Sequence, residues 1–398
     1  MKSKLFLIAG ALSLGVITQL QAQTRVHITG STAFRNAAYD AISAQFDAAP
    51  AVQIAAYSAN ATSLDPHTAS FMTFDGNISS AHYIVKTHWS GSEAGIKDIA
   101  TGVKESFTAD IGTGGIVAGT FSAAPGTTVS TNVDVAFADN AQANSLTKTP
   151  LAGTNFLVGI VPFKWVKNAQ SGAPADWTRL TNVTDHQLRV ALSGGTKLAL
   201  MTGNTNDTKF VYVAGRDNQS GTRVNALADT RYGIKTSVDQ ITIAGPSGAP
   251  VNTDAGNSGQ GSGGTLANSM GIVGSATNLD SIQTVLQGSN VFGWYALAYL
   301  GVADSVTAIN AGAVEVSLDG VAESPAAIKE GQYSFFGVEQ ILTNPSLGAS
   351  PQTTFAGSLA NAFIQNTNVP IILDGTNGIA LKDMHATKAT DLSDPTHN

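Results

Sequence analysis

The chain of 398 residues has no cysteine, few charged residues and only one long apolar run. Without cysteine it can form neither a disulfide nor a thiolate metal site, and no lipid-modified cysteine can follow a leader peptide. Charged residues make up 12% of the chain and the net charge is −7, which argues against nucleic acid and acidic membranes as partners. Hydrophobic residues reach 43%, enough to bury a large core.

The one long apolar run extends from Leu5 to Ile17 and follows Lys2 and Lys4. This layout predicts a secretory signal peptide over residues 1–22, cleaved after Ala22. The run is shorter than the roughly 20 residues that a membrane helix needs. The alternative is a buried N-terminal helix. We therefore expect a soluble mature protein that is periplasmic or secreted, with the net charge of −7 becoming −9 without the two lysines.

Four stretches run from an apolar strand into small polar residues, and in three of them a helical pattern follows. In RVHITGSTAFRNAAYDAISAQF the turn is residues 30–32, with Ser31 or Thr32 as the expected helix N-cap. In HYIVKTHWSGSEAGIKDIATGV the turn is residues 90–92, and Ile96 and Ile99 are expected to face inward.

The third stretch, VDVAFADNAQANS, ends its strand at Asp139, and the fourth, KFVYVAGRDNQSGTRVNALADTRYG, contains Arg216. A helix N-terminus carries unpaired N–H groups and a partial positive charge, so small residues before it let an anion approach. In α/β sheets, ligands collect at the carboxyl ends of the strands. Turns that converge there predict an oxyanion site, although each turn taken alone is consistent with an ordinary strand–helix junction.

Two long connections separate these stretches. Residues 105–132 are expected to form an extended loop or a hairpin insertion, and residues 245–269 a glycine-rich loop. The Gly259-x-Gly261-x-x-Gly264 pattern within the second lacks the preceding strand and the later acid of a dinucleotide site.

No pattern predicts catalysis. The seven histidines form no H-E-x-x-H motif, and there is no G-x-S-x-G elbow. His82 and His88 are too far apart to share one ion, so surface or packing roles are expected. The chain is therefore expected not to be an enzyme and to need no cofactor.

The motifs GST, GSEAGIKDI, VDVAFAD and R-x-x-x-SGT, in this order, resemble those of the phosphate-binding proteins of ABC importers. The later segments GSNVFGWYALAYLGV and LDGVAESPAAIKEGQYSFFGVEQIL agree with this resemblance. It implies an α/β periplasmic-binding-protein-like fold of type II, in which each of two lobes is a mixed sheet flanked by helices and the ligand lies in a cleft between them. Lobe 1 would comprise residues 23–160 and 334–398, and lobe 2 residues 161–333.

By position, the resemblance implies that Arg216 pairs with phosphate and that Asp139 accepts the proton of monohydrogen phosphate, a proton that sulfate lacks. Asp139 could instead be a plain helix N-cap. Ala33 stands where the family usually has an aromatic residue, for which Phe34 could be a shifted equivalent. The implied phosphate site consists of Ser31, Thr32, Ala33, Ser92, Asp139, Arg216, Ser220, Gly221 and Thr222.

Two positions depart from the family pattern. Asn218 replaces the acid that usually holds the arginine, and the adjacent Asp217 could serve instead. Glu93 follows Ser92; pointing inward it would weaken phosphate binding, and facing solvent it would only complement the helix dipole. Arg223 has no role in the family pattern and is expected to face solvent.

The resemblance thus implies a monomeric, exported protein that captures phosphate and delivers it to an ABC permease in the inner membrane. Two alternatives stay open. One is a binder or sensor of another oxyanion without transport, and the other is a secreted structural or surface protein that kept the fold and has no ligand.

Overall fold

The computed structural model describes residues 23–57, 65–122, 125–151, 153–275, 293–364, 373 and 378–397. The expected signal peptide, residues 1–22, lies outside the described residues. Within the described part of the chain, no helix has both the length and the apolarity to cross a membrane.

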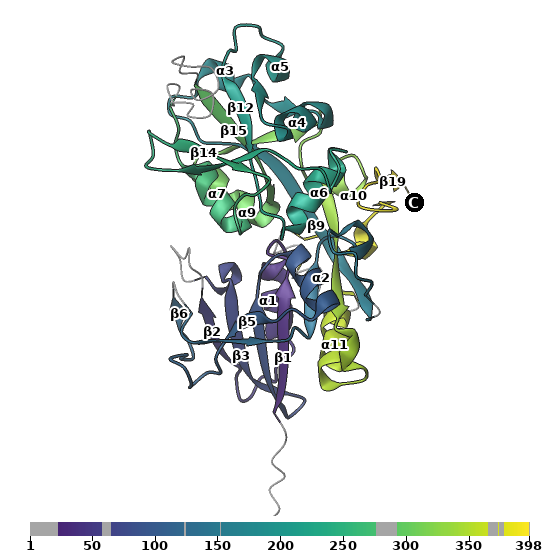
Figure 1. Cartoon of the computed structure of the whole chain (residues 1–398). Coiled ribbons are helices and arrows are strands. Elements are labelled where there is room, and N and C mark those ends of the chain that lie inside the picture. The colour runs from purple at the N-terminus through teal and green to yellow at the C-terminus, as the bar shows by residue number, and fades with distance from the viewer. Residues whose placement is uncertain are drawn as a thin grey trace, which may run out of the picture.

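Fifteen of the described strands form one large mixed sheet that runs through two halves of the molecule (Figure 1), and the other four form two separate pairs. The lower half in Figure 1 contains β1 (Thr24–Gly30), β2 (Gln53–Tyr57), β3 (Phe71–Ile78), β4 (Ala81–His88), β6 (Phe121–Ser122) and β8 (Val135–Ala138), with helices α1 (Arg35–Ser43), α2 (Ser92–Thr101) and α11 (Pro351–Ile364). The α/β class predicted from the sequence is therefore confirmed.

The upper half contains the remaining strands of the sheet and most of the shorter helices (Figure 1). Its strands are β10 (Asn182–Val183), β11 (Thr196–Lys197), β12 (Phe210–Ala214), β13 (Gln240–Ala244), β14 (Val251–Gly256), β15 (Trp294–Gly301) and β16 (Val314–Leu318). Its helices are α3 (Ala175–Thr178), α4 (Asp185–Leu192), α5 (Ala199–Thr202), α6 (Gly221–Asp229), α7 (Gly263–Gly271), α9 (Val302–Asn310) and α10 (Pro325–Lys329).

Two strands connect the halves. β9 (Asn155–Lys167) pairs with β17 (Phe336–Thr343) through residues 155–162, and with β15 and β16 through residues 163–167. Trp165, in the second part of β9, has no exposed surface and packs against Tyr299 and Phe335. The sheet thus continues without a break from one half to the other.

The strands that precede the polar turns are parallel neighbours. In the lower half, β1 lies between β8 and β4 and is parallel to both. In the upper half, β12 is parallel to β15 and β13. Parallel neighbours end at the same edge of a sheet, so the residues that follow them are brought together.

The first helix begins later than predicted. α1 starts at Arg35 and its N-cap is Phe34, so the prediction of Ser31 or Thr32 as N-cap is wrong. The backbone N–H of Ser31 donates to the Phe137 carbonyl at 2.9 Å, which keeps the chain paired with β8 beyond the end of β1. Ile96 and Ile99 of α2 are buried, as predicted.

The two long connections differ from each other. Residues 105–132 contain the antiparallel pair β5 (Glu105–Thr108) and β7 (Thr128–Thr131), and β6 between them pairs with β2, so this connection is neither a plain loop nor a simple hairpin. The prediction of a loop over 245–269 is wrong, because this segment contains β14 and the start of α7. Ser262 caps α7 by accepting from the N–H of Thr265, and the apolar face of the helix is buried through Leu266 and Met270.

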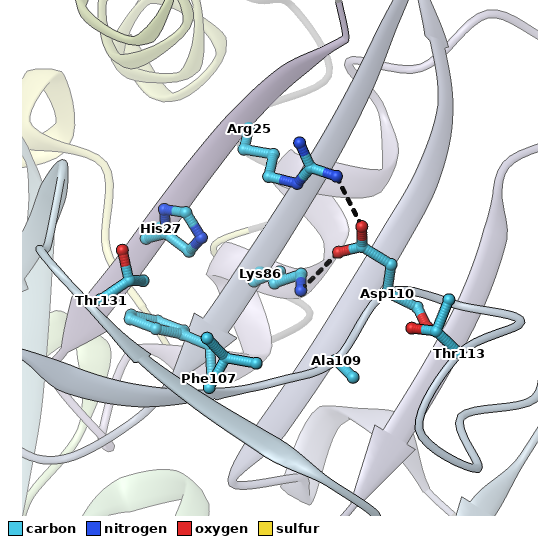
Figure 2. Close-up of a pocket in the computed structure, with 9 residues that line it drawn as sticks. Arg25, His27, Lys86, Phe107, Ala109, Asp110, Thr113 and Thr131 are labelled. Carbon is cyan, nitrogen blue, oxygen red and sulfur yellow. Dashed lines mark hydrogen bonds and ion pairs between the residues drawn. The ribbon is translucent and has the colours of Figure 1, made fainter.

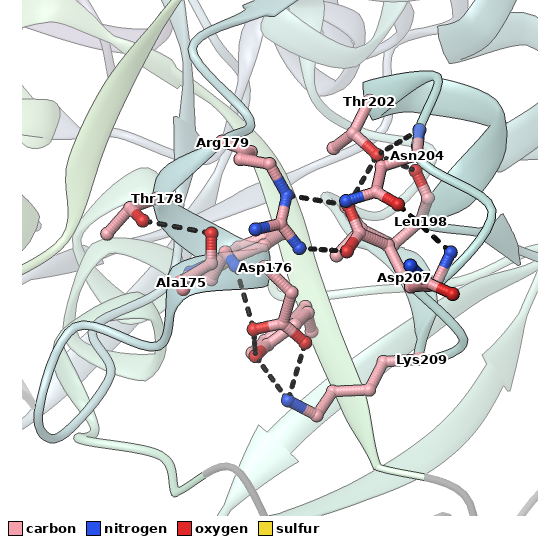
Figure 3. A network of polar contacts seen from close by, with 12 residues as sticks. Ala175, Asp176, Thr178, Arg179, Leu198, Thr202, Asn204, Asp207 and Lys209 are labelled. Carbon is pink, nitrogen blue, oxygen red and sulfur yellow. Dashed lines mark hydrogen bonds and ion pairs between the residues drawn. The ribbon is translucent and has the colours of Figure 1, made fainter.

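A polar network holds α3 against β12 and β15 (Figure 3). Asp207, whose side chain has no exposed surface, accepts two hydrogen bonds from Arg179 and one from Thr202. Asp176 accepts from Lys209 at 2.7 Å and from the Tyr295 hydroxyl at 2.8 Å. Every charge in the network has a partner of opposite sign, as expected for a structural ion-pair cluster.

The C-terminal segment packs over the place where α6 meets β17. Lys388 is buried, with its Nζ 3.7 Å from Asp229 Oδ1 and 3.1 Å from the Phe336 carbonyl oxygen. Asp391 accepts from the Ala141 N–H at 2.9 Å, which ties the same segment to the turn after β8.

Replacing Lys388 by Met should lower the free energy of unfolding by about 3 kcal/mol, because it leaves the buried Asp229 without its cation. Chemical denaturation of the purified protein measures this loss. The double variant K388M/D229N removes both charges and should recover part of the stability. Equal losses in the single and double variants would contradict the assigned pairing.

Candidate functional site

Three polar residues meet where β1, β4 and β8 end. Asp139 follows β8 directly, and its carboxylate accepts from the Ser92 hydroxyl at 2.9 Å and the Ser31 hydroxyl at 3.3 Å. Ser92 is the first residue of α2, which follows β4, and Ser31 follows β1. All three side chains are buried. The convergence expected from parallel strands is therefore present.

Asp139 is not a helix N-cap. The short 3₁₀ turn after it begins at Gln142, and its N-cap is Ala141 without a side-chain bond. Burial raises the pKa of Asp139 to about 6, against the opposing effect of its two serine donors and of Arg216. The carboxyl therefore ionises just below neutral pH and can accept a proton or a hydrogen bond from a bound group.

The N-terminus of α6, in the upper half, rests directly on this carboxyl group. A Cβ atom added to Gly221 would lie 1.7 Å from Asp139 Oδ1 and 2.6 Å from Ser92 Oγ, so no larger residue fits. Ser220 caps the helix by accepting from the N–H of Arg223 at 3.2 Å. Asn225, one turn later, donates to the Asp139 carbonyl oxygen at 2.9 Å. Thr222 is also buried in this first turn.

The first turn of α2 also contacts the upper half. The N–H groups of Glu93 and Ala94 donate to the carbonyl oxygen of Gln219, at 3.0 and 3.4 Å. Gly91 has a φ of 110° and approaches Gln219 so closely that a Cβ atom would lie 2.3 Å from that oxygen. Glycine is therefore required here both by the backbone conformation and by the close approach.

Arg216 follows β12 and its side chain is buried between the halves. Its Nε donates to the Gln260 carbonyl at 3.0 Å and its Nη2 to the Gly261 carbonyl at 3.1 Å. Its Nη1 lies 3.4 Å from the Thr32 hydroxyl oxygen of the lower half. A guanidinium has five N–H groups, and these bonds use three of them. The segment expected to be a loop thus supplies the backbone that orients Arg216.

The expected acidic partner of Arg216 is absent from the hydrogen bonds of the described residues. Asp217 accepts from the N–H of Gln219 at 3.0 Å and so shapes its own turn. Two carbonyl oxygens take the place of the family's acid in these hydrogen bonds, while Asp217 and Asp304 act on Arg216 through their charges alone. With Asn218 in the sequence, backbone carbonyl oxygens hold the guanidinium group of Arg216 in place of an acid, and its orientation stays fixed.

Arg223 and Glu93 differ from their predictions. Arg223 is buried and does not face solvent; it donates to the carbonyls of Arg216 and Asn257, at 3.0 and 3.1 Å. Glu93 points neither into the site nor to solvent, because its carboxylate accepts from Asn140, Ser145 and the Leu146 N–H at 2.7–2.8 Å. Both residues stabilise backbone turns beside the site.

Sequence reasoning missed a second arginine, Arg35 of α1. Its Nη2 donates to Asp304 of α9 at 2.9 Å across the two halves, and both side chains are buried. Its Nε is buried and has no hydrogen-bond partner. Arg35 comes directly after the GSTAF motif. Only the tertiary fold shows that Asp304 of α9 is its acidic partner.

Ala33 and Phe34 contribute by packing. Ala33 faces Gly301 at the end of β15, where a Cβ atom on the glycine would lie 3.1 Å from that of Ala33. Phe34 is in the core against Phe137 and Phe363, so it does not replace the aromatic residue of the family pattern at the site.

A separate cavity of about 310 Å³ lies near the opposite end of β1 (Figure 2). Arg25 and Lys86 line it, and both pair with Asp110, at 2.7 and 2.6 Å. His27, the third residue of the cavity wall that can carry a positive charge, has its Nδ1 3.1 Å from Asp134 Oδ2. These acids neutralise the cations, so the cavity is a weaker anion site than the cluster around Arg216. Within the described residues, no group of three or more His, Asp or Glu side chains could hold a metal ion.

The fold and the polar cluster define an α/β protein with buried groups of both charges between its halves. No protein-family model and no curated protein matches the sequence. Two similar solved structures are a protein from Clostridium perfringens, described as a phosphate ABC transporter substrate-binding protein with bound phosphate, and an ABC-type phosphate transport receptor from Vibrio cholerae. A third is PstS from Borrelia burgdorferi.

The similarity to these three structures extends over most of each chain. The sequence identity is 13% in each case, with TM-scores of 0.47, 0.45 and 0.39. The matches cover 90, 89 and 90% of this chain and 100, 99 and 98% of the others. The ligand of this chain is therefore inferred from its own residues.

Replacing Gly221 by Ala should lower the free energy of unfolding by at least about 2 kcal/mol, because the new methyl group would overlap Asp139 and Ser92. Thermal and chemical denaturation measure the change. Gly357→Ala in α11 is the matched control, since its nearest neighbour is 3.9 Å away and alanine favours a helix. Similar stability of the two variants would show that α6 does not press on Asp139 as described.

Proposed function

We propose that this chain binds an oxyanion, and that monohydrogen phosphate matches the site best. The proposed lobes are residues 23–160 with 334–398 and residues 161–333, with the ligand between them. The observation that carries the proposal is the meeting of two buried opposite charges, Asp139 from the lower half and Arg216 from the upper half. They are linked through adjacent residues, because Ser31 contacts Asp139 and Thr32 contacts Arg216.

The donors around this point suit an oxyanion. Arg216 keeps two N–H groups beyond its three described bonds, and the buried Nε of Arg35 has no partner. A buried donor without a partner costs about 1–3 kcal/mol, which a bound anion would recover. Neutral donors complete the proposed site: the hydroxyl groups of Ser31, Thr32, Ser92 and Ser220, with the backbone N–H groups of Ala33, Gly221 and Thr222.

Asp139 provides selectivity in this proposal. A carboxylate repels an oxyanion unless the ligand donates a proton to it. Monohydrogen phosphate carries such a proton and sulfate at neutral pH does not, so Asp139 favours phosphate. On binding, the Ser31 and Ser92 hydroxyls, which now donate to Asp139, turn to the ligand.

In this role the protein is an exported, monomeric solute-binding protein without catalytic activity or cofactor, and an ABC permease in the inner membrane receives its phosphate. Binding favours the arrangement in which the halves touch, because only then do Arg216 and Asp139 reach one ligand. The contacts between Glu93 N–H and Gln219 and between Arg35 and Asp304 would stabilise the same arrangement.

One observation favours a second candidate, a secreted structural protein on this fold without a ligand. The amides at the start of α2, a natural anion site, are already occupied by the Gln219 carbonyl oxygen, and Asp139 has both oxygens bonded to serines. The cluster would then serve only to join the two halves.

Calorimetric titration of the purified protein with phosphate and with sulfate at neutral pH separates these functions. We expect dissociation constants in the micromolar range or tighter for phosphate, and no heat with sulfate. Binding of sulfate but not phosphate would favour another oxyanion, whereas silence towards both would favour the structural candidate.

Arg216→Ala should abolish phosphate binding, because it removes the charged fork that neutralises the ligand. Arg216→Lys keeps the charge without the planar fork and should bind at least tenfold more weakly than the unmodified protein, by about 1.4 kcal/mol or more. Arg189→Ala, on α4 in the upper half, is the control and should bind normally. Circular dichroism verifies folding of each variant; a folded R216A with normal affinity would disprove the site.

Asp139→Asn should reduce the preference for phosphate over sulfate, because the amide can donate to an anion that has no proton. We expect the ratio of the two dissociation constants to fall by at least about tenfold. Competition titration measures this ratio directly. An unchanged ratio would remove Asp139 from its assigned role while leaving oxyanion binding itself intact.

A further inference from the structure

A second carboxyl group lies in the interior close to Asp139. Glu339, on β17, has no exposed surface, and neither of its carboxyl oxygens has a hydrogen-bond partner. An ionised carboxylate in such a place would cost far more than a neutral one. The resemblance to phosphate-binding proteins assigns Glu339 no role, and sequence reasoning gave no signal for it.

The strand register places Glu339 beside Asp139. β17 is antiparallel to β8, with Gln340 opposite Ala138, and Glu339 and Asp139 are the next residues along the two segments. The Ser31 hydroxyl, which donates to Asp139, also acts on Glu339. On its other side Glu339 lies opposite Gly159 of β9, which carries no side chain that could pair with it. Side chains opposite each other on neighbouring strands lie about 5 Å apart.

The charges around the two carboxyl groups are unequal. Burial raises the pKa of Asp139, its two serine donors and Arg216 lower it, and Asp391 raises it. For Glu339, burial and the neighbouring Asp139 both raise the pKa well above its usual range, and only the Ser31 hydroxyl acts in the opposite direction. Two neighbouring buried carboxylates do not both ionise readily, so the proton of the pair belongs on Glu339, on which no cation acts and which shares only the Ser31 hydroxyl.

We infer that Asp139 and Glu339 hold one proton between them, that Glu339 carries it, and that this neutral neighbour keeps Asp139 an ionised acceptor for the proton of the bound oxyanion. Glu339 is thus a positioning residue that acts through Asp139. The effect on ligand binding rests on the proposed function. The location of the proton rests only on the buried pair of carboxyl groups.

At alkaline pH, the charge of Glu339 should affect phosphate binding. When Glu339 loses its proton, its negative charge lies beside Asp139 and the bound dianion, and the affinity for phosphate falls. Glu339→Gln has nearly the same shape and cannot become negative. It should therefore keep its affinity where the unmodified protein loses it.

The first measurement is the phosphate dissociation constant of both proteins between about pH 7 and pH 10. Phosphate itself titrates in the same way in both experiments. The ratio of the two dissociation constants therefore reports only the effect of the residue at position 339. We expect E339Q to bind about tenfold tighter than the unmodified protein at the alkaline end, relative to neutral pH. Asp98→Asn is the control: its carboxyl is also buried, with a pKa raised to about 7, yet it lies on α2 beyond the site and should not change the ratio.

The second measurement does not need a ligand. If folded Glu339 keeps its proton, its pKa is above that of the unfolded chain, so stability falls as pH rises from about 5, with a slope of close to one proton. E339Q should lack that part of the slope in urea denaturation. Glu339→Asp, which can still be protonated, should retain it.

The outcomes separate the two hypotheses. Equal pH slopes for E339Q and the unmodified protein would show that Glu339 holds no proton and overturn the inference. A lost slope with a constant affinity ratio would show a proton that does not act on the site, and would also overturn it. Absence of phosphate binding at every pH would overturn the proposed function and the part of the inference that concerns binding. The dependence of the free energy of unfolding on pH would still decide where the proton lies.

Discussion

The contact between Asp139 and the first turn of α6 sets the relation between the two halves. Asp139 follows a strand of one half, and Gly221 of the other half lies against it with no room for a methyl group. A carboxyl group excluded from water needs donors, and here Ser31, Ser92 and Asn225 provide them from three different elements. The position of one side chain therefore constrains α2, α6 and the end of β1 together.

Local sequence predicted those parts of the site that depend on strand order. Asp139 was predictable because a polar residue directly after a parallel strand lies at the carboxyl edge of the sheet, and Ser92 because it begins the helix that follows such a strand. The start of α6 was predictable because Ser220 has the side chain of an N-cap and helical spacing follows it. In each case the physical cause acts within a few residues of the side chain concerned.

The remaining parts depend on contacts between segments far apart in the sequence. Arg223 has the spacing of a surface residue, yet it is buried because Asn257 and the Arg216 carbonyl accept its N–H groups. Glu93 was placed wrongly because its three donors come from residues 140–146. Arg35 and Asp304 are 269 residues apart, and no local pattern marks them as a pair. Buried charges are thus the residues for which sequence spacing predicts least.

The electrostatic arrangement explains how so weakly charged a chain could attract an anion. Arg216 is held by the carbonyl oxygens of Gln260 and Gly261, which orient the guanidinium without cancelling a full unit of charge. Arg35 pairs with Asp304, whose charge also acts on Arg216 together with those of Asp217 and Asp139. If the proposed oxyanion binds here, groups of both signs in a medium of low polarity make the proton on the ligand, and not the total charge, the basis of selection.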